Sequence, residues 1–426
     1  MKDKKETGIT LIALVVTIVV LIILATVSIN AVLGQNGIIN KAKQAKEIYS
    51  NSIAKENEEM DTLLNEMAQD NGGNSSDGGS SSDNEKVTLP AGWNGDKVNP
   101  VKSEDNIVVP VPKGYTASTV TGEKSVASGF VIKEGNDGSK TEGINEFVWV
   151  PVSNISDIYD EANNAGQLWD FGTSSSPKNP AVKRTYPTTK NSSFREPDVV
   201  TSANSGSDSS SGSSYDAVST NLQKAGLSST ATASTFKTQL QNEFNEMIKS
   251  VKTYGGFYIG RYETGDLSQT KAVVQKNNTD IGSQTWYTQY KLCKTIKANN
   301  NAATSMIWGC QWDATLRWMQ TSTNSEVANF PTNSEGKGNY SGTQGATNKV
   351  IPTGSNSAYA VNNIYDMVGN VYDWTIEAGN TDGRILRGGD YYNPASHDPA
   401  GYRNGAGPIY GPGNYGCRST LYVKQP

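Results

Sequence analysis

Histidine and cysteine are scarce in this chain, and their scarcity limits the chemistry that it can perform. The 426 residues include a single histidine, His397, and three cysteines, Cys293, Cys310 and Cys417. Three thiols allow at most one intramolecular disulfide with one thiol left over, and their spacing fits no zinc motif. One imidazole cannot build a site of several histidines, and the sequence offers it no convincing Ser-His-Asp partners.

An excess of positive charge is missing as well. The chain has 37 Lys and Arg against 42 Asp and Glu, which gives a formal net charge of -5. Surfaces that bind nucleic acid need clustered Lys and Arg to neutralise phosphates. We therefore expect no nucleic-acid partner.

Charge is absent altogether from one long stretch near the N-terminus. No Asp, Glu, Lys or Arg lies between Gly8 and Lys41, and three lysines precede the stretch. A helix over residues 9–32 would be about 36 Å long, enough to cross a hydrocarbon core of about 30 Å. The basic flank predicts that the leader stays in the cytoplasm and that the rest of the chain lies outside the membrane. A cleaved secretory signal fits less well, because the apolar run is too long.

The same stretch resembles the leader of type IV prepilins and pseudopilins. A basic leader ends at Gly8 and is followed by Ile9-Thr10-Leu11-Ile12. The resemblance implies that a prepilin peptidase cuts between Gly8 and Ile9, that Ile9 is then methylated, and that pilin-like subunits are partners. The family usually has Glu at the fifth mature position, where this chain has Ala13, a change that suits a tip or minor subunit. An ordinary signal anchor is the alternative.

The composition after this stretch changes twice. Apolar residues continue at helical spacing to about residue 70 and predict a stalk. A stretch of mainly Gly, Ser, Asn and Asp follows, which cannot bury enough apolar surface to fold. We divide the chain into a leader (1–8), a transmembrane or pilin-like helix with its stalk (9–70), a Gly/Ser-rich linker (71–86) and one large domain (87–426).

Local patterns inside the large domain predict a mixture of strands and helices. Strands are expected at residues 106–111, 129–133, 146–152 and 256–262. Helices are expected at 234–252 and 312–320, where apolar residues recur every three or four positions. The segment 153–232 is rich in Ser, Asn, Thr and Gly. We interpret it as an insertion that is partly disordered.

Several blocks of the domain resemble the formylglycine-generating-enzyme (sulfatase-modifying factor) family. They are Glu146-Phe147-Val148-Trp149-Val150-Pro151-Val152, the block from Tyr365 to Trp374, Arg387-Gly388-Gly389-Asp390 and Gly416-Cys417-Arg418. The blocks stand in the family's order from Glu146 to the C-terminus. The resemblance implies an α+β domain of the C-type lectin-like fold, of the formylglycine-generating-enzyme type, behind the N-terminal transmembrane or pilin-like helix.

The family's copper site has no counterpart in this sequence. The family oxidises a substrate cysteine with copper held by two cysteines, and counting along the chain places those positions near Asn393 and Asp398. No cysteine lies between Arg387 and Cys417. Because Cu(I) prefers thiolate ligands, we expect no copper and no copper-dependent oxidation. His397 beside Asp398 could act as an acid–base pair, and a polar loop histidine is the simpler interpretation.

The block from Tyr365 to Trp374 carries a second expectation. In the family this block turns around a calcium ion, which prefers oxygen ligands. The resemblance implies a structural calcium held by the carboxylates of Asp366 and Asp373 and by the main-chain carbonyls of Gly369 and Val371. A tight turn without an ion is the alternative.

The segment 390–415 has the composition of a binding surface. It holds five tyrosines among Asn, Asp, Ser, Gly and Pro. Tyrosine supplies a large amphipathic contact area at a low cost in rotamer entropy, and small polar residues adapt hydrogen bonds around it. A surface loop without a ligand is the alternative. The candidate ligand-binding residues are Asp390, Tyr391, Tyr392, Asn393, Ser396, His397, Asp398, Tyr402, Asn404, Tyr410 and Asn414.

The same segment also resembles the variable region of diversity-generating retroelement proteins, which crowd Tyr, Asn, Asp, Ser, His and Gly after the RGG element. We therefore expect a display protein on the bacterial cell surface, membrane-anchored or associated with a pilus. Its catalytically inactive domain would bind an extracellular protein or glycan. Two alternatives stay open: an extracytoplasmic oxidoreductase of the formylglycine-generating class, and a structural minor pilin.

Overall fold

The computed structural model describes residues 87–187, 194–200, 215–296, 301–321, 328–342, 348–379 and 383–425. By internal contacts the chain divides into two units, Met1–Asn84 and Glu85–Pro426. The predicted leader, membrane helix, stalk and linker, with Gly8 and Ile9, lie outside the described residues. Within the described ranges, no helix combines the length and the apolar character that crossing a bilayer requires.

The described domain is rich in strands, and its largest sheet has six of them. Neighbouring strands of this sheet are antiparallel throughout. The C-terminal strand lies inside the sheet between two strands from the middle of the chain, so the sheet is complete only when the whole domain has folded. In spatial order the strands are β11 (Ala302–Met306), β18 (Ser419–Val423), β10 (Gly256–Gly260), β5 (Glu146–Pro151), β4 (Val131–Glu134) and β3 (Tyr115–Ala117).

A second sheet of four strands carries the C-terminal part of the chain. Its central pair, β14 and β15, is antiparallel, while β14 and β17 run parallel. Short hairpins accompany the two sheets, among them β1 (Val98–Lys102) with β2 (Val108–Pro112) and β12 (Ala360–Val361) with β13 (Ile364–Tyr365). In spatial order the strands of the second sheet are β16 (Asn404–Ala406), β15 (Arg384–Arg387), β14 (Tyr372–Ala378) and β17 (Tyr415–Cys417).

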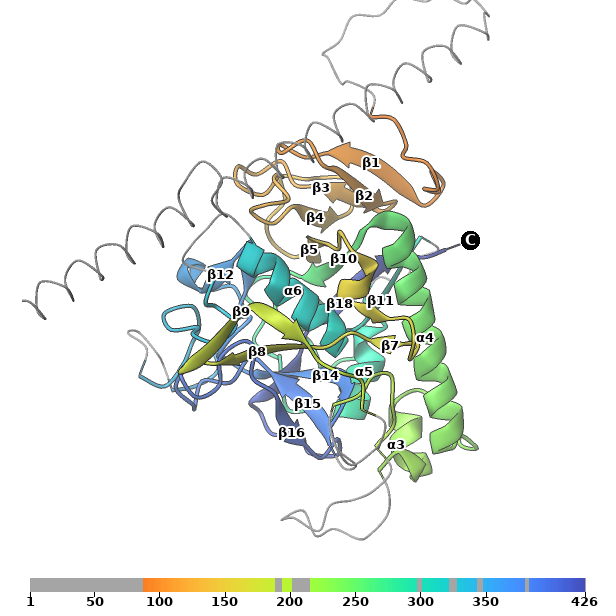
Figure 1. Ribbon diagram of the computed structural model, residues 1–426, viewed down its shortest axis with the longest axis vertical. Coiled ribbons are helices and arrows are strands. Elements are labelled where there is room, and N and C mark those ends of the chain that lie inside the picture. Colours follow the sequence, from red (N-terminus) through yellow and green to blue (C-terminus); the bar gives the residue numbers. More distant parts are fainter. Residues whose placement is uncertain are drawn as a thin grey trace, which may run out of the picture. The chain divides into compact units, whose positions relative to one another are not determined.

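Four α-helices lie in the described part of the chain: α3 (Ser219–Lys224), α4 (Ala233–Tyr254), α5 (Trp286–Cys293) and α6 (Gly309–Thr321). The longest, α4, runs beside β10, β18 and β11 (Figure 1). It begins with a capping box between Thr232 and Thr235 and ends at Gly255 in the left-handed conformation (φ 76°). Its apolar face, which includes Phe236 and Phe244, is fully buried.

The sequence predictions for regular elements are largely confirmed. The four expected strands correspond to β2, β4, β5 and β10, and the two expected helices to α4 and α6. The expected start of α6 was three residues late. The main-chain N–H groups of Gly309 and Cys310 donate to the carboxylate of Glu196 at 2.6 Å each. This distant partner extends the helix by satisfying N–H groups that have no partner inside it.

The Ser/Asn-rich segment 153–232 takes part in the core through its described residues. Its few large apolar side chains, including Leu168, Trp169 and Phe171, are buried. It also forms two hairpins and two short 3-10 helices. The bounds are η1 (Ile155–Asp157), β6 (Tyr159–Asp160), β7 (Ala165–Gly166), β8 (Trp169–Thr173), β9 (Ser176–Lys183) and η2 (Tyr215–Ala217).

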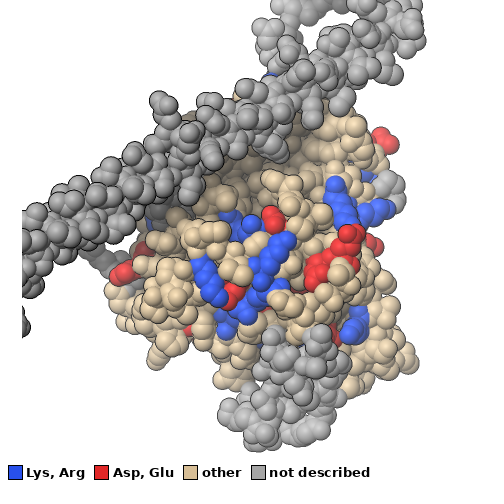
Figure 2. Space-filling model, in the orientation of Figure 1, with Lys and Arg blue, Asp and Glu red and all other residues tan. Residues whose placement is uncertain are grey.

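Charged side chains of both signs lie together on the face drawn in Figure 2, with uncharged surface around them. Surface ion pairs of the described residues include Lys178 with Asp170 (2.5 Å) and Arg317 with Asp157 (3.0 Å). The guanidinium of Arg317 also lies 3.5 Å from the centre of the Trp169 ring. This face therefore offers no broad surface of a single sign of charge.

Candidate functional site

The segment 390–415 leaves the second sheet and returns to it. It begins just after β15, contributes β16 to one edge of the sheet, and ends at β17 beside β14. The segment is therefore held at its start, its middle and its end by one sheet. Such a loop is positioned by a rigid scaffold, as binding loops commonly are.

The carboxylate of Asp390 is buried beneath the segment and joins its two ends. One oxygen accepts the main-chain N–H groups of Tyr392 (3.0 Å) and Asn393 (3.1 Å). The other accepts from the side-chain amide of Asn414 at 2.5 Å. Because Asp390 is only 1% exposed, it shapes the main chain and does not face solvent.

A second buried carboxylate, Asp398, fixes the middle of the segment. The hydroxyl of Tyr372, on β14, donates to one oxygen of Asp398 and accepts from the amide of Asn393 (3.1 Å). The other oxygen lies 2.8 Å from Nδ1 of His397. Burial and the hydrogen bond to Asp398 raise the pKa of Tyr372 well above its usual range. Tyr372 is thus a neutral donor at every physiological pH.

The rings on the outside of the segment are strongly exposed. Tyr392 is 73% exposed, Tyr410 47% and Tyr402 38%, and the His397 side chain is 67% exposed. Six large hydrophobic or aromatic side chains of the described residues are exposed, and three of them belong to this segment. The segment therefore presents several aromatic rings to solvent.

The other predicted binding residues differ in how far they are exposed to solvent. Tyr391 is half-buried and packs edge-on against Tyr392, with ring centres 5.7 Å apart. Ser396 is exposed, while Asn404 is partly buried in β16. The structure therefore brings the predicted residues to one loop system and separates them into outward rings and inward anchors.

Helix α5, which the sequence analysis did not predict, supports the far end of the segment. The main-chain N–H of Trp286 donates to the carbonyl of Pro408 (3.0 Å). The side-chain amide of Gln289 donates to the carbonyl of Tyr415 (2.8 Å). Trp286 and Gln289 are both fully buried. The helix is short and almost entirely buried, so it shows no amphipathic periodicity that could have revealed it.

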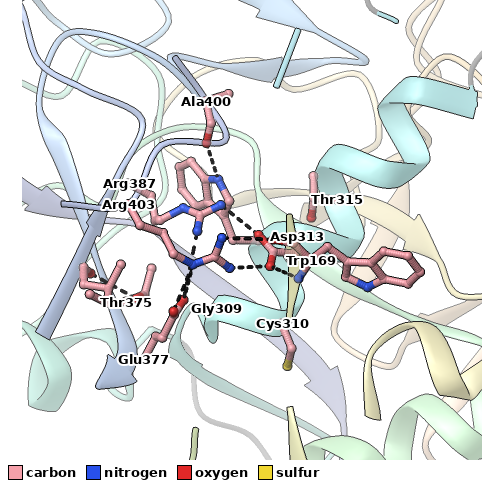
Figure 3. Close-up of polar contacts among 12 residues, drawn as sticks. Trp169, Gly309, Cys310, Asp313, Thr315, Thr375, Glu377, Arg387, Ala400 and Arg403 are labelled. Carbon is pink, nitrogen blue, oxygen red and sulfur yellow. Dashed lines mark hydrogen bonds and ion pairs between the residues drawn. The ribbon is translucent and has the colours of Figure 1, made fainter. Parts of the chain in front are cut away.

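A buried ion network lies beneath the segment and includes one of its residues, Arg403. Figure 3 shows the guanidinium of Arg403 between Glu377 of β14 and Asp313 of α6. Arg387 of β15 donates to the other oxygen of Asp313 at 2.8 Å. The main-chain N–H of Trp169 also donates to Asp313 (2.8 Å). The side chains of the two arginines and the two acids are 0–4% exposed.

The predicted calcium ligands are arranged around an arginine. The carboxylate of Asp366 accepts from the Thr353 hydroxyl (2.9 Å) and the Gly354 N–H (2.8 Å). The guanidinium of Arg418 donates to the carbonyl of Asp366 (2.8 Å) and to the carboxylate of Asp373 (3.3 Å). One guanidinium thus contacts both residues, Asp366 through its main-chain oxygen and Asp373 through one carboxylate oxygen, while the other carboxylate oxygen of Asp373 is buried without a hydrogen-bond partner. The calcium site stays a prediction. Nowhere in the described ranges do three or more His, Cys, Asp or Glu side chains come together to hold a metal.

Gly369 and Val371, the predicted carbonyl ligands, belong to a tight turn with its own requirements. Gly369 has φ +71°, and a Cβ there would lie 2.6 Å from the main-chain oxygen of Asn339. Glu263 is fully buried beside the turn and accepts from the side-chain amide of Asn370 at 2.6 Å. Burial and the nearby Asp366 and Asp373 raise the pKa of Glu263 well above its usual range. The turn is therefore closely packed around Gly369 and beside a buried carboxylate.

Comparisons with known proteins give weak likenesses. No family model matches the chain, and no curated protein matches it. The crystal structure of CarF is 13% identical over 40% of this chain and 87% of CarF, with a TM-score of 0.27. PvdO from Pseudomonas aeruginosa is 17% identical over 40% and 81% (TM-score 0.28), and variable protein 1 of Treponema denticola is 14% identical over 66% and 98% (TM-score 0.27).

The first prediction concerns the hydroxyl of Tyr372. Tyr372→Phe should lower the free energy of unfolding by about 1–2 kcal/mol, because one oxygen of buried Asp398 loses its partner. Tyr410→Phe, the same change on an exposed ring, should cost less than about 0.5 kcal/mol. All eight tryptophans lie between Trp93 and Trp374, so tryptophan fluorescence during urea unfolding of the full chain in detergent reports on this domain. Equal losses in the two variants would contradict the anchoring role of Asp398.

The second prediction concerns Glu196, beside the ion network. Burial and the nearby Glu377 raise the pKa of Glu196 to about 7. The folded chain therefore keeps a proton that the unfolded chain loses above about pH 4.5, and stability should fall as pH rises from about 4.5 to 7. Glu196→Gln stays neutral. From pH 5 to pH 8 its unfolding free energy should rise by about 2 kcal/mol relative to wild type.

Urea unfolding at each pH measures this difference, and the exposed Glu161→Gln variant is the matched control. Glu161 lies on the surface, with its side chain 87% exposed, so its change should leave the pH dependence as it is in wild type. A difference between wild type and Glu196→Gln that stays constant from pH 5 to pH 8 would show that Glu196 is not protonated in the folded domain.

Proposed function

We propose that this chain is a ligand-binding display protein of the bacterial cell surface, whose catalytically inactive domain has the C-type lectin-like fold of the formylglycine-generating type. The observation that carries the proposal is the segment 390–415. Its exposed rings stand on a main chain that Asp390 and Asp398 fix from below. Loops held in one conformation before binding lose little entropy when a ligand arrives.

The exposed groups of the segment form an uncharged surface, which favours a ligand without charge. The charged residues of the segment, all of whose residues are described, are Asp390, Asp398 and Arg403, and each of these side chains is buried or paired inside the domain. What faces solvent is phenol, imidazole, hydroxyl and amide. Such groups stack on apolar faces and exchange hydrogen bonds, which suits a glycan or a protein surface better than a phosphorylated ligand.

The residues at the predicted copper positions support the inactive assignment. Asn393 donates to Tyr372, and Asp398 accepts from Tyr372 and contacts His397. Each therefore has a structural partner inside the domain. Membrane attachment through the N-terminal helix, with processing between Gly8 and Ile9 and pilin-like partners, is carried by the sequence pattern and forms part of the same proposal.

The third prediction tests binding directly. The full chain in detergent is applied to arrays of glycans and of extracellular proteins, and a hit is compared across variants. Tyr392→Ala and Tyr410→Ala should each weaken binding about 10-fold, because aromatic contacts in an interface are worth 1–2 kcal/mol or more. Val182→Ala changes an exposed side chain elsewhere (54% exposed) and should leave binding unchanged. Retained binding in the double tyrosine variant, or copper-dependent oxygen consumption with a cysteine peptide, would overturn the proposal.

The fourth prediction concerns sequence variation, which the resemblance to retroelement variable proteins brings into the proposal. Deep sequencing of the 3′ end of the gene in its source population should find changes concentrated at exposed positions such as 392, 397, 402 and 410. The anchors Asp390, Asp398 and Arg403 should stay constant, because their replacement removes buried hydrogen bonds. If codons 390–415 are uniform in the population, the diversification hypothesis is wrong. The segment would then bind one fixed ligand.

A further inference from the structure

Two of the three cysteines touch in the folded domain. The sulfurs of Cys293 and Cys417 lie 3.2 Å apart, although 124 positions separate the residues in the chain. Both side chains are fully buried. Cys293 is the last residue of α5 and Cys417 the last residue of β17. The third cysteine, Cys310, lies at the start of α6 beside Glu196.

The contact lies at the end of the segment 390–415. Helix α5 already supports this end through Gln289, which donates to the carbonyl of Tyr415 two residues before Cys417. On the other side, Thr264 donates its main-chain N–H to the carbonyl of Cys417 (2.9 Å). A covalent bond here would join α5 to the strand that returns the segment to the second sheet.

We propose that Cys293 and Cys417 form an intramolecular disulfide in the exported protein, and that this bond fixes the end of the segment 390–415. A disulfide needs about 2.05 Å between its sulfurs, so the two sulfurs have about 1 Å to close. The predicted location outside the cytoplasm is an environment in which such bonds persist.

The bond forms by exchange with the disulfide of an extracytoplasmic thiol–disulfide exchange protein. The thiolate of one cysteine attacks a sulfur of that disulfide and displaces its partner thiolate, which gives a mixed disulfide. The second cysteine of this chain then attacks the sulfur of the first cysteine in the mixed disulfide. This forms the intramolecular bond and releases the remaining thiolate of the exchange protein. The two cysteines lose two protons and two electrons, and the exchange protein leaves as a dithiol.

Burial sets the time at which this exchange can occur. Neither thiol is exposed once the domain has folded, and burial raises the pKa of the Cys417 thiol well above its usual range. A buried, protonated thiol reacts poorly. The bond must therefore form before β17 docks on β14, and a reduced protein that has already folded should resist oxidation.

The test counts thiols in the full chain, purified in detergent from cells that export it. After unfolding in denaturant without reductant, a maleimide should label one cysteine of the three, and peptide mass spectrometry should place the label on Cys310. The same digest should contain a cross-linked peptide joining Cys293 to Cys417. Three labelled cysteines, or a bridge that includes Cys310, would overturn the proposal.

Two variants and one measurement on the unchanged chain complete the test. Cys310→Ser should show no free thiol, whereas Cys293→Ser should show two. In the wild type, reduction should lower Tm by about 5 °C and speed amide exchange in residues 408–417. Reduced protein refolded from denaturant with oxidised glutathione should regain the bond, while reduced protein kept folded should not. Identical Tm values and exchange rates for oxidised and reduced protein would show that the bond holds nothing in place.

Discussion

The buried ion network of Arg387, Arg403, Asp313 and Glu377 is the interaction on which the rest of the site depends. Removing each of these ions from water costs several kcal/mol, and only close pairing with well-made hydrogen bonds offsets that cost. The network has two positive and two negative members, so it balances when Glu196 beside it is protonated. A register shift in any contributing element would leave a buried charge unpaired, so the network specifies how α6, β14 and β15 meet.

The network also explains how one segment can be both fixed and exposed. Arg403 is anchored among buried carboxylates, while Tyr402, its neighbour in the chain, is 38% exposed. The same alternation recurs at Asp398, which is buried next to exposed His397. Anchor and contact residues are adjacent in sequence, so the anchors hold the main chain at the points from which the rings project.

The regular elements were predictable because their signals are local. The apolar repeat and caps of α4, and the apolar runs of β5 and β10, lie within single stretches of sequence. Composition likewise identified the segment 390–415. It could not separate Asp390 and Asp398 from the outward residues, because their burial is set by Asn414 and Tyr372. The residues next to a carboxylate in a loop do not indicate whether its side chain is buried or faces solvent.

The calcium expectation shows the same limit. The expectation came from the resemblance of the block from Tyr365 to Trp374, and the element Gly416-Cys417-Arg418 belongs to the same resemblance. The sequence could not show that Arg418 from the second element reaches Asp366 and Asp373 in the first. Arg418 contacts the main-chain oxygen of Asp366 and the carboxylate of Asp373, and this arrangement depends on tertiary distances that no motif contains.

A surface can tolerate substitution when the stability of the domain comes from other residues. In this domain the exposed rings and the buried anchors are different residues. Exposed side chains far from special contacts change stability by about 0.5 kcal/mol or less when replaced, whereas loss of a buried partner costs about 1–3 kcal/mol. The rings at 392, 402 and 410 belong to the first class, and Asp390, Asp398 and Arg403 to the second. His397 is exposed but also lies 2.8 Å from the Asp398 carboxylate. Because Asp390 and Arg403 have their partners inside the domain, replacing the rings at 392, 402 and 410 should leave these anchors in place. This separation of buried anchors from exposed rings follows from burial alone and does not depend on the identity of the proposed ligand.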